Sequence, residues 1–584
     1  MKQLIIYLLI LSHLTIFAQE KPKWDVNNPP GNFKEVSFTT NEGTWMNVDV
    51  SPDGSMIAFD MLGDIYTMPI SGGTATAIRT GLAWEVQPRW SPDGKKILFT
   101  SDSAGGDNIF YMDVDGKNVK QITKESFRLL NNAVWMPDGQ YIIARKHFTS
   151  GRSLGAGEMW MYHISGGEGI QLTKRKNDQQ DVNEPTISPD GKMLYYSEDV
   201  YPGGYFQYNK DPNSEIFVIN SYNIETGETK RVTGGPGGAC RPQISNKGDK
   251  IAYVRRVREK SVLYIYEIST GREWAIYDQL SKDQQEAWTV FGIYTGFDWM
   301  PDDKEIVIWA KGKIVKINIA DKKATDIPFT VNAKHKLMET VQFENKAYEE
   351  NFDVKVLRNA VTSPDGSQLV FSALGSLYVS KNGQTPVRLT TGTDFEAEPQ
   401  FNAKGDQIVY VTWDDESLGK IQTYNFATKK STVVTKDPAI YRTPSFSPDG
   451  AQIVYRKEGG NGHQGYQYNT NSGIYTADVN GENATLITQE GEKPIFSADG
   501  NEIYFTTGGF LFGSIAKALK KYSLKTKKTE VVFNTSYTTN FVPSPDNKWV
   551  AFTELYKVYI APMPKTGQPI GLSAKTKAIP VAQV

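Results

Sequence analysis

Histidines are the first residues to test for metal chemistry, because several neutral imidazoles usually hold the metal of a hydrolase. The chain has five: His13, His147, His163, His335 and His463. No two of them stand at the close spacing, such as His-x-His, that a metal site needs. The sequence therefore predicts no metal and no cofactor.

One segment has the spacing of a serine nucleophile. Gly151-Arg152-Ser153-Leu154-Gly155 fits the G-x-S-x-G elbow, which requires a buried strand before it and a helix after it. Here the segments on both sides, 141–148 and 158–164, are strand-like, and the nearness of His147 and Asp178 in sequence proves no geometry. We expect a loop and predict no catalytic residue.

A set of polar residues is the better candidate for binding. Each stands four positions before a recurring turn, where the innermost strand of a repeat would meet a central channel, and together they could bind a ligand or peptide. The set is Asn47, Gln87, Asn132, Glu184, Arg241, Asn359, Glu398, Thr443 and Lys493. The simpler interpretation is that such channels are polar because water fills them.

Two long aromatic loops form a second candidate. They span 201–213 and 459–471, and their amphipathic side chains are of the kind enriched at contact surfaces. These side chains are Tyr205, Gln207, Tyr208, Tyr466, Gln467 and Tyr468. Binding to a partner and packing over a neighbouring repeat remain equally open.

A four-residue turn is the element that must position these residues. It reads Ser-Pro-Asp-Gly at Ser51, Ser91, Ser188, Ser363 and Ser447, with relaxed copies beginning at Met136, Ser245, Met300, Asn402, Ser497 and Ser544. Proline fixes the first corner, aspartate caps the backbone, and glycine supplies the positive φ that closes a hairpin. Acidic turns such as Asp113 and Asp115 are explained by the same chemistry, because they lack the full calcium ligand set.

The residues that follow each turn predict strands. The third residue after the turn is Ile, Leu or Val in all eleven copies, and successive turns start 39 to 63 residues apart. Two further strand-like segments follow in each copy, so that every repeat holds four antiparallel strands, which is the pattern of a propeller blade. A β-solenoid is the alternative fold, but its coils are much shorter than these repeats.

The fold class is therefore all-β, with two consecutive propellers. Six turns predict a six-bladed propeller over 35–328, residues 329–356 carry no turn and are read as a connector, and five further turns place a second propeller at 357–584. Five blades do not close a usual ring. Either the connector supplies a sixth blade, or the sequence stops before the last one.

The first residues differ from the rest in hydropathy. Lys2, the apolar run 4–17 and the small residue Ala18 predict a secretory signal peptide over 1–19, too short to be a membrane span. Cys240 is the only cysteine, so no intramolecular disulfide forms. The net charge of -2 gives no reason to expect nucleic acid as a partner, and no later segment is apolar enough to cross a membrane. We expect an exported protein of the periplasm or the exterior.

With the Pro-Asp-Gly turns in place, the sequence from about Trp24 onward resembles TolB-type and tricorn-type propellers. The segments WDVNNPPGNFKEVSFTTNEGTWMNVDVSPDG, GLAWEVQPRWSPDG and RKNDQQDVNEPTISPDG are most similar to the propeller half of secreted amidohydrolase-family proteins of the Bacteroidetes type. That resemblance implies a propeller that shields, gates or presents substrate to a metal-dependent barrel, which this chain lacks. The alternative is a stand-alone propeller that binds a protein or peptide, such as an envelope protein.

Overall fold

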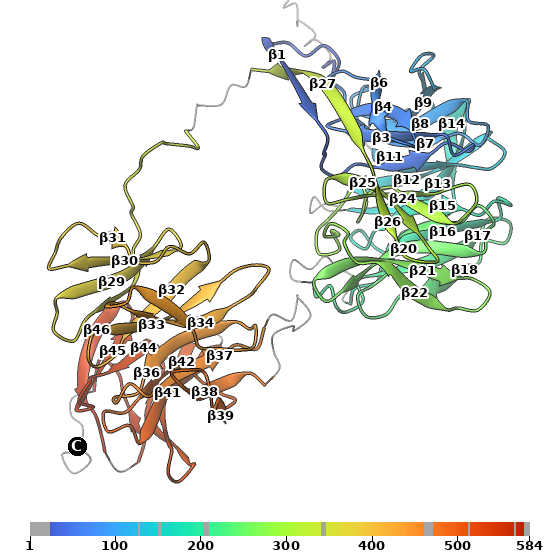
Figure 1. Ribbon diagram of the computed structural model, residues 1–584. Coiled ribbons are helices and arrows are strands. Elements are labelled where there is room, and N and C mark those ends of the chain that lie inside the picture. Colours follow the sequence, from blue (N-terminus) through green and yellow to red (C-terminus); the bar gives the residue numbers. More distant parts are fainter. Residues whose placement is uncertain are drawn as a thin grey trace, which may run out of the picture. The chain divides into compact units, whose positions relative to one another are not determined.

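Every regular element among the described residues is a β-strand. The computed structural model describes residues 24–126, 129–149, 155–202, 210–339, 346–460, 471–511, 514–565 and 568–576, and the predicted signal peptide lies outside them. These residues form two compact units, which divide near residue 343 (Figure 1). Within the described ranges there is no helix of the length and hydropathy that a membrane span requires.

The first unit is a propeller of six four-stranded antiparallel sheets. In chain order the sheets consist of β2 (Val48–Val50), β3 (Met56–Met61), β4 (Asp64–Pro69) and β6 (Thr76–Arg79); β7 (Glu85–Trp90), β8 (Lys96–Ser101), β9 (Asn108–Asp113) and β10 (Lys120–Gln121); β11 (Leu129–Trp135), β12 (Tyr141–Thr149), β13 (Gly155–His163) and β14 (Gly166–Gln171); β15 (Val182–Ile187), β16 (Met193–Asp199), β17 (Phe217–Asn223) and β18 (Thr229–Thr233); β19 (Cys240–Ile244), β20 (Lys250–Val257), β21 (Lys260–Glu267) and β22 (Glu273–Tyr277); and β23 (Asp298–Trp299), β24 (Glu305–Ala310), β25 (Lys313–Asn318) and β26 (Ala324–Ile327).

The recurring turn folds as its residue types require. The hydroxyl of Ser51 donates to Asp53 Oδ1 at 2.6 Å and accepts the backbone N–H of Met56 at 2.9 Å. Gly54 has a φ of 72°, in the left-handed region that glycine adopts without strain. The Ser51 hydroxyl, with the N–H and hydroxyl of Ser55, donates to Asp53 and lowers the pKa of its carboxyl to about 2. The same serine–aspartate contact recurs at Ser91, Ser188, Ser363, Ser447, Ser497 and Ser544.

The first ring closes by contact between its first and last sheets. Strand β2 packs against β23 and β24, and the indole N–H of Trp309 donates to the carbonyl of Gly43 at 2.8 Å. A separate three-stranded sheet lies beside this junction, in which β27 (Phe329–Met338) pairs with β1 (Phe33–Thr40) and with β5 (Gly73–Thr74). The first ten residues of the expected connector 329–356 are thus a strand of the first unit, because Phe329, Val331 and Ala333 are buried in its core.

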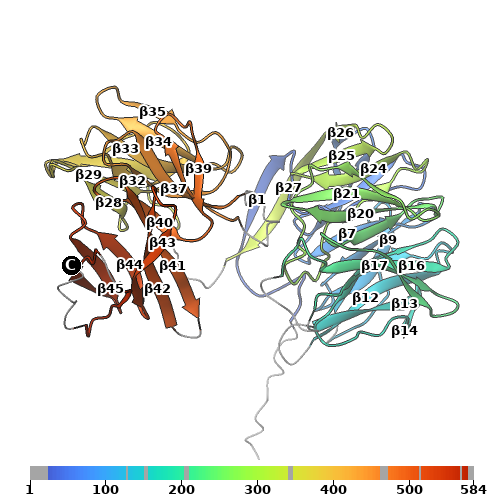
Figure 2. The same cartoon turned by 90° about the horizontal axis from the view of Figure 1, so that it is seen from below.

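The second unit contains five successive sheets (Figure 2). They consist of β28 (Arg358–Thr362), β29 (Gln368–Ala373), β30 (Ser376–Lys381) and β31 (Val387–Arg388); β32 (Phe395–Phe401), β33 (Gln407–Trp413), β34 (Lys420–Asn425) and β35 (Lys430–Val433); β36 (Tyr441–Phe446), β37 (Gln452–Lys457), β38 (Gly473–Asp478) and β39 (Thr485–Thr488); β40 (Glu492–Phe496), β41 (Glu502–Leu511), β42 (Ser514–Ser523), β43 (Thr529–Thr535) and β47 (Ile570–Gly571); and β44 (Thr538–Pro543), β45 (Trp549–Glu554) and β46 (Lys557–Pro562). Strand β47 pairs in parallel with β43 and so belongs to the fourth sheet. The last sheet is left with three strands.

The all-β fold with two propellers, predicted from the turns, is confirmed. The two rings differ at their ends. Whereas β2 packs on the last sheet of the first ring, none of the described strands β44–β46 makes an extensive contact with β28–β31.

Candidate functional site: the channel mouths

The polar residues selected from the sequence share one backbone feature. All except Asn47 have a positive φ, between 46° and 60°, and lie where the innermost strand shifts register against its neighbour. Such a bulge turns the side chain out of the sheet plane, toward the next blade or the channel. Non-glycine residues seldom adopt this conformation, so the side chain must serve a purpose there.

In the first propeller that purpose is to join neighbouring blades. The carboxylate of Asp60 accepts the backbone N–H of Gln87 at 2.7 Å, and the amide oxygen of Gln87 accepts that of Asn132 at 2.8 Å. Glu184 Oε2 accepts the N–H of Arg241 at 2.6 Å, and the Arg241 guanidinium donates back to Asn132 Oδ1 at 2.9 Å. Every one of the five predicted residues in this ring is at most 5% exposed.

Burial shifts the pKa values of the charged groups in this ring. It raises the pKa of the Asp60 carboxyl to about 6, although N–H groups of Gln87 and Asn47 donate to it, and it lowers the pKa of Arg241 to about 10. Both groups are out of reach of solvent and hydrogen-bond to neighbouring blades of the protein. The five first-ring residues therefore tie the blades together in this structure.

The mouth of the first channel is filled by a segment of the chain itself, residues 287–297, which we call the plug. Backbone carbonyls of Thr289, Val290 and Phe291 accept hydrogen bonds from Asn183 Nδ2 at 3.2 Å, Asn131 Nδ2 at 3.0 Å and Gln87 Nε2 at 2.8 Å. At the far end of the plug, the N–H of Ile293 donates to Glu184 Oε1 at 2.6 Å and that of Gly296 to Asn47 Oδ1 at 2.7 Å. These donors and acceptors are thus satisfied by the plug rather than by a ligand.

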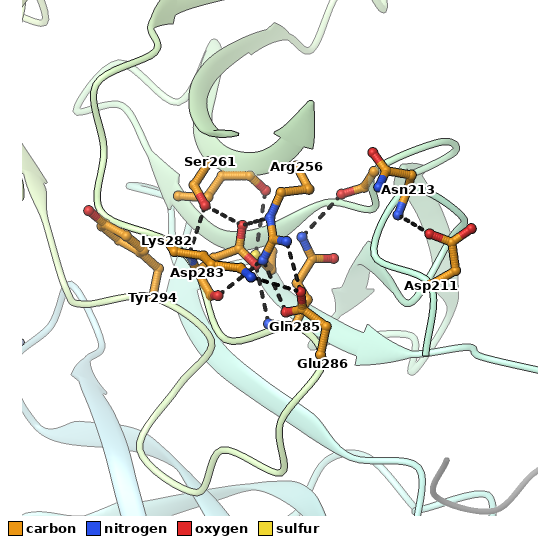
Figure 3. A network of polar contacts seen from close by, with 12 residues as sticks. Asp211, Asn213, Arg256, Ser261, Lys282, Asp283, Gln285, Glu286 and Tyr294 are labelled. Atoms are coloured by element: carbon orange, nitrogen blue, oxygen red, sulfur yellow. Dashed lines mark hydrogen bonds and ion pairs between the residues drawn. The ribbon is translucent and has the colours of Figure 1, made fainter. Parts of the chain in front are cut away.

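A buried ion pair anchors the chain just before the plug (Figure 3). The Arg256 guanidinium binds the Asp283 carboxylate at 2.7 and 2.9 Å and Glu286 at 2.8 and 3.0 Å. The Ser261 hydroxyl also donates to Asp283, and Arg256 and Asp283 are 2% and 1% exposed. Because the donors and acceptors are matched, the pair fixes where the plug begins.

A second polar layer lies two residues further along the innermost strands. The Arg89 guanidinium binds Asp49 at 2.7 Å, while Gln243 Nε2 donates to Asp298 Oδ1 at 3.0 Å. Burial and the Asp49 carboxylate raise the pKa of Asp298 to about 8. Burial also raises the pKa of Asp49, and the Arg89 guanidinium opposes that shift.

The predicted residues of the second propeller are in a more open setting. Asn359 and Lys493 are exposed, and Glu398 and Thr443 are half-buried. Glu398 repeats the bond between blades by accepting the N–H of Thr443 at 2.5 Å, and it also binds the Arg442 guanidinium at 2.6 Å. Lys493 Nζ donates to Asn540 at 2.8 Å. Among the described residues, no hydrogen bond joins these four side chains to a segment comparable to the plug.

A cavity of about 640 Å³ opens at this mouth. It brings Asn359 and Glu398 together with residues that the sequence analysis did not select, chiefly Arg358, Phe395, Trp413 and Arg442. Phe395 is 53% exposed, and Glu398 and Arg442 give the wall a charge of each sign. The useful signal in the sequence is that two residues next to the bulge position, Arg358 and Arg442, are charged. The first ring has only uncharged residues at that place: Met46, Val86, Asn131, Asn183 and Cys240.

The remaining predicted residues do not assemble into a site. All six residues of the aromatic loops, and residues 151–154 of the elbow motif, lie outside the described ranges; Gly155 begins β13. His147 contacts Arg145 at 2.9 Å, His163 contacts Ser165, and His335 in β27 lies 3.7 Å from Asp64. In the part of the chain that the structure describes, no three His, Cys, Asp or Glu side chains are grouped to hold a metal.

Comparison of the sequence with known proteins identifies the same kind of propeller repeat. Residues 15–205 match the model of the TolB beta propeller domain. An uncharacterized protein of Agrobacterium fabrum is 29% identical over 158 residues, which are 25% of this chain and 52% of that protein. The uncharacterized peptidase YuxL of Bacillus subtilis is 26% identical over 190 residues, 25% of this chain and 28% of that protein. The chain thus spans about half or less of these relatives.

Among solved structures, the tricorn protease matches 88% of this chain and 46% of its own, with 14% identity and a TM-score of 0.38.

Proposed function

We propose that this chain, with a TolB-type propeller match in its first third, is an exported binding scaffold without catalytic activity of its own. Its ligand is an extended peptide, which binds at the mouth of the second propeller. The cavity lined by Asn359 and Glu398 is the observation that supports this, because the corresponding residues of the first ring are buried under the plug.

The cavity has the chemistry that a peptide needs. A volume of about 640 Å³ lies within the usual range for binding pockets. Phe395 offers an exposed ring for an apolar side chain, and Arg358 offers a guanidinium for a carbonyl or carboxylate. A mouth with three aromatic residues, Phe395, Trp413 and Tyr441, and a few polar groups binds by shape and hydrogen bonding rather than by net charge.

The finer assignment is an accessory role beside a hydrolase of the amidohydrolase type. It is supported by the resemblance of the N-terminal segments. Relatives named as peptidases, such as YuxL, match this chain over only part of their own length. In that role the second mouth would hold or present substrate for a partner domain, and export would follow from residues 1–19.

Binding is tested with a library of immobilised hexapeptides and the purified chain. We expect a subset of peptides to bind, and Phe395→Ala and Arg358→Gln each to weaken that binding about tenfold, the ratio for about 1.4 kcal/mol. Arg231→Gln is the matched control, because Arg231 pairs with Glu215 on the outside of the first propeller.

Two results would contradict the proposal. One is equal binding by all three variants, which would place the ligand elsewhere. The other is turnover of peptide or ester substrates by the chain alone with added Zn²⁺, which would show a catalytic site.

A further inference from the structure

The interface between any two neighbouring blades uses the same two positions. The third residue after the turn faces the preceding sheet, and an aliphatic residue or methionine in the third strand faces the following one. For example, Ile65 of the first sheet packs with Ile97 and Phe99 of the second. In the second unit, Leu377 packs with Ile408 and Ile474 with Ile503 in the same way.

The residue that faces the following sheet is buried in ten of eleven sheets. Its exposed fraction is at most 1% in each of Ile65, Ile109, Met159, Ile219, Leu263, Ile314, Leu377, Ile421, Ile474 and Leu519. The eleventh is Val558 in β46, which is 70% exposed. Ile560 and Val542 extend this open face, and they are 71% and 53% exposed.

The residue that faces the preceding sheet shows the complementary exception. It is fully buried in ten sheets, as Ile57, Ile97, Ile142, Leu194, Ile251, Ile306, Ile408, Ile453, Ile503 and Val550. The eleventh is Leu369 in β29, which is only half-buried. The two exceptions belong to the last and the first sheet of the second ring.

We propose that the slot between β44–β46 and β28–β31 is a docking site for one antiparallel β-sheet of a partner polypeptide. The occupant carries Ile or Leu on the face toward Val558 and an aliphatic residue on the face toward Leu369. It continues an interface that this chain already makes between its own neighbouring blades, and it is independent of the peptide site proposed above.

The other occupants fit the two faces less well. The last described strand, β47, pairs with β43 rather than with β46, and exposed apolar faces on two different sheets require a sheet to cover both. A second copy of the chain holds its complete sheets inside its own rings and would have to open one to supply it. A separate sheet covers both exceptions at once.

The test uses a thiol at position 558. Cys240 is fully buried, so a Val558→Cys variant of the full chain presents one reactive thiol. The probe is a copy of residues 395–433, which contain β32–β35, fused to a soluble carrier. We expect maleimide to label Val558→Cys rapidly at every protein concentration, and the probe to slow labelling about tenfold, as a docked fraction of about 90% would.

The control variant is Ile170→Cys, because Ile170 is 59% exposed on the first propeller and its labelling should not change. Slow labelling of the chain alone would show that its own tail fills the slot, and slowing with concentration would show a second copy; either result overturns the proposal. If the carrier-borne sheet fails to fold, the same copy appended after Val584 decides. Unchanged labelling there means that the slot does not accept a sheet.

Discussion

At the scale of single residues, the side chains at the left-handed bulges join neighbouring blades by hydrogen bonds. Glu184 accepts four hydrogen bonds with its two oxygens, from Arg241, Ser197, Ile293 and Tyr294. It therefore holds a neighbouring blade and the plug at once. Its removal leaves buried N–H groups without an acceptor, and such groups are costly.

We predict that Glu184→Ala lowers the free energy of unfolding of the first propeller by about 3 kcal/mol. Glu398→Ala, the same change at the half-buried position of the second ring, should cost only about 1 kcal/mol because water reaches the freed groups. Denaturant unfolding of both variants measures the difference. Equal losses would show that the plug contributes nothing to the bond at Glu184.

The Asp49–Asp298 pair predicts a pH dependence. The pKa of Asp298 is raised to about 8 in the folded state, above its unfolded value of about 4. The protonated form is thus the favoured one, so its stabilisation is complete below about pH 4 and is lost as the pH rises through about 8. We expect stability to fall over this range, by at most about 1.4 kcal/mol per pH unit.

Asp298→Asn should flatten that slope, since an amide keeps an oxygen for Gln243 but cannot ionise. Asp302→Asn is the matched control, because the pKa of Asp302 in the exposed turn is lowered by its hydrogen bonds to Lys304. The measurement is the midpoint of thermal unfolding between pH 4 and pH 9. A slope that survives in Asp298→Asn would assign it to another group.

The bulge residues could be found from the sequence but their role could not. Their fixed distance before the turn identified the eight bulge residues, together with Asn47, since the register of a hairpin is set by its turn. Whether a bulge residue is buried depends on a segment that is distant in the sequence. Gln87 and Asn359 occupy the same place in their blades, yet the plug covers only Gln87. A local difference is the preceding residue, Val86 in the first case and the charged Arg358 in the second.

At the scale of elements, the plug is the part that departs from the repeat. The sequence does not single it out, because the interval before the turn at Met300 is shorter than those before Ser245 and Ser363. The strands, in contrast, follow from a period of two and a turn repeated eleven times. Likewise β27 was missed as a strand because its partner β1 is about 300 residues away in the sequence.

We predict that Asp283→Ala frees the plug, since it leaves the Arg256 guanidinium buried with only Glu286 to pair with. The expected result is faster amide hydrogen exchange in residues 287–297 and a loss of about 3 to 5 kcal/mol. The double variant Arg256→Met/Asp283→Leu should recover much of that stability, because it buries no lone charge. Unchanged exchange in Asp283→Ala would mean that the hydrogen bonds to Asn131 and Gln87 hold the plug without this anchor.

At the scale of the whole molecule, the two rings should differ in stability. The first ring is closed by β2 against β23 and β24, whereas the last sheet of the second leaves Val558 and Ile560 in water. Buried apolar area is the main source of stability in both. Because the open second ring leaves part of its apolar area exposed, we expect its free energy of unfolding to be the smaller of the two.

Calorimetry should accordingly show two transitions, the lower one belonging to the second unit. Leu519→Ala should lower the temperature of only that transition, and Ile314→Ala the temperature of only the upper one. In each case the free energy of unfolding of the affected unit should fall by about 2 to 5 kcal/mol, which is typical when a buried aliphatic side chain is truncated. The two residues hold equivalent places in β42 and β25 and are at most 1% exposed. One transition that both variants shift would show that the units unfold together.

The pairing of β1 with β27 also has a mechanical consequence. Phe33 lies opposite Met338 and Thr40 opposite Val331, so the chain enters and leaves the first propeller at the same end of one antiparallel ribbon. Tension between the segment before β1 and the second unit would load these pairs one at a time, as in a zipper, instead of shearing them together. The ribbon should peel apart at low force, lengthening the molecule while all six blades stay folded.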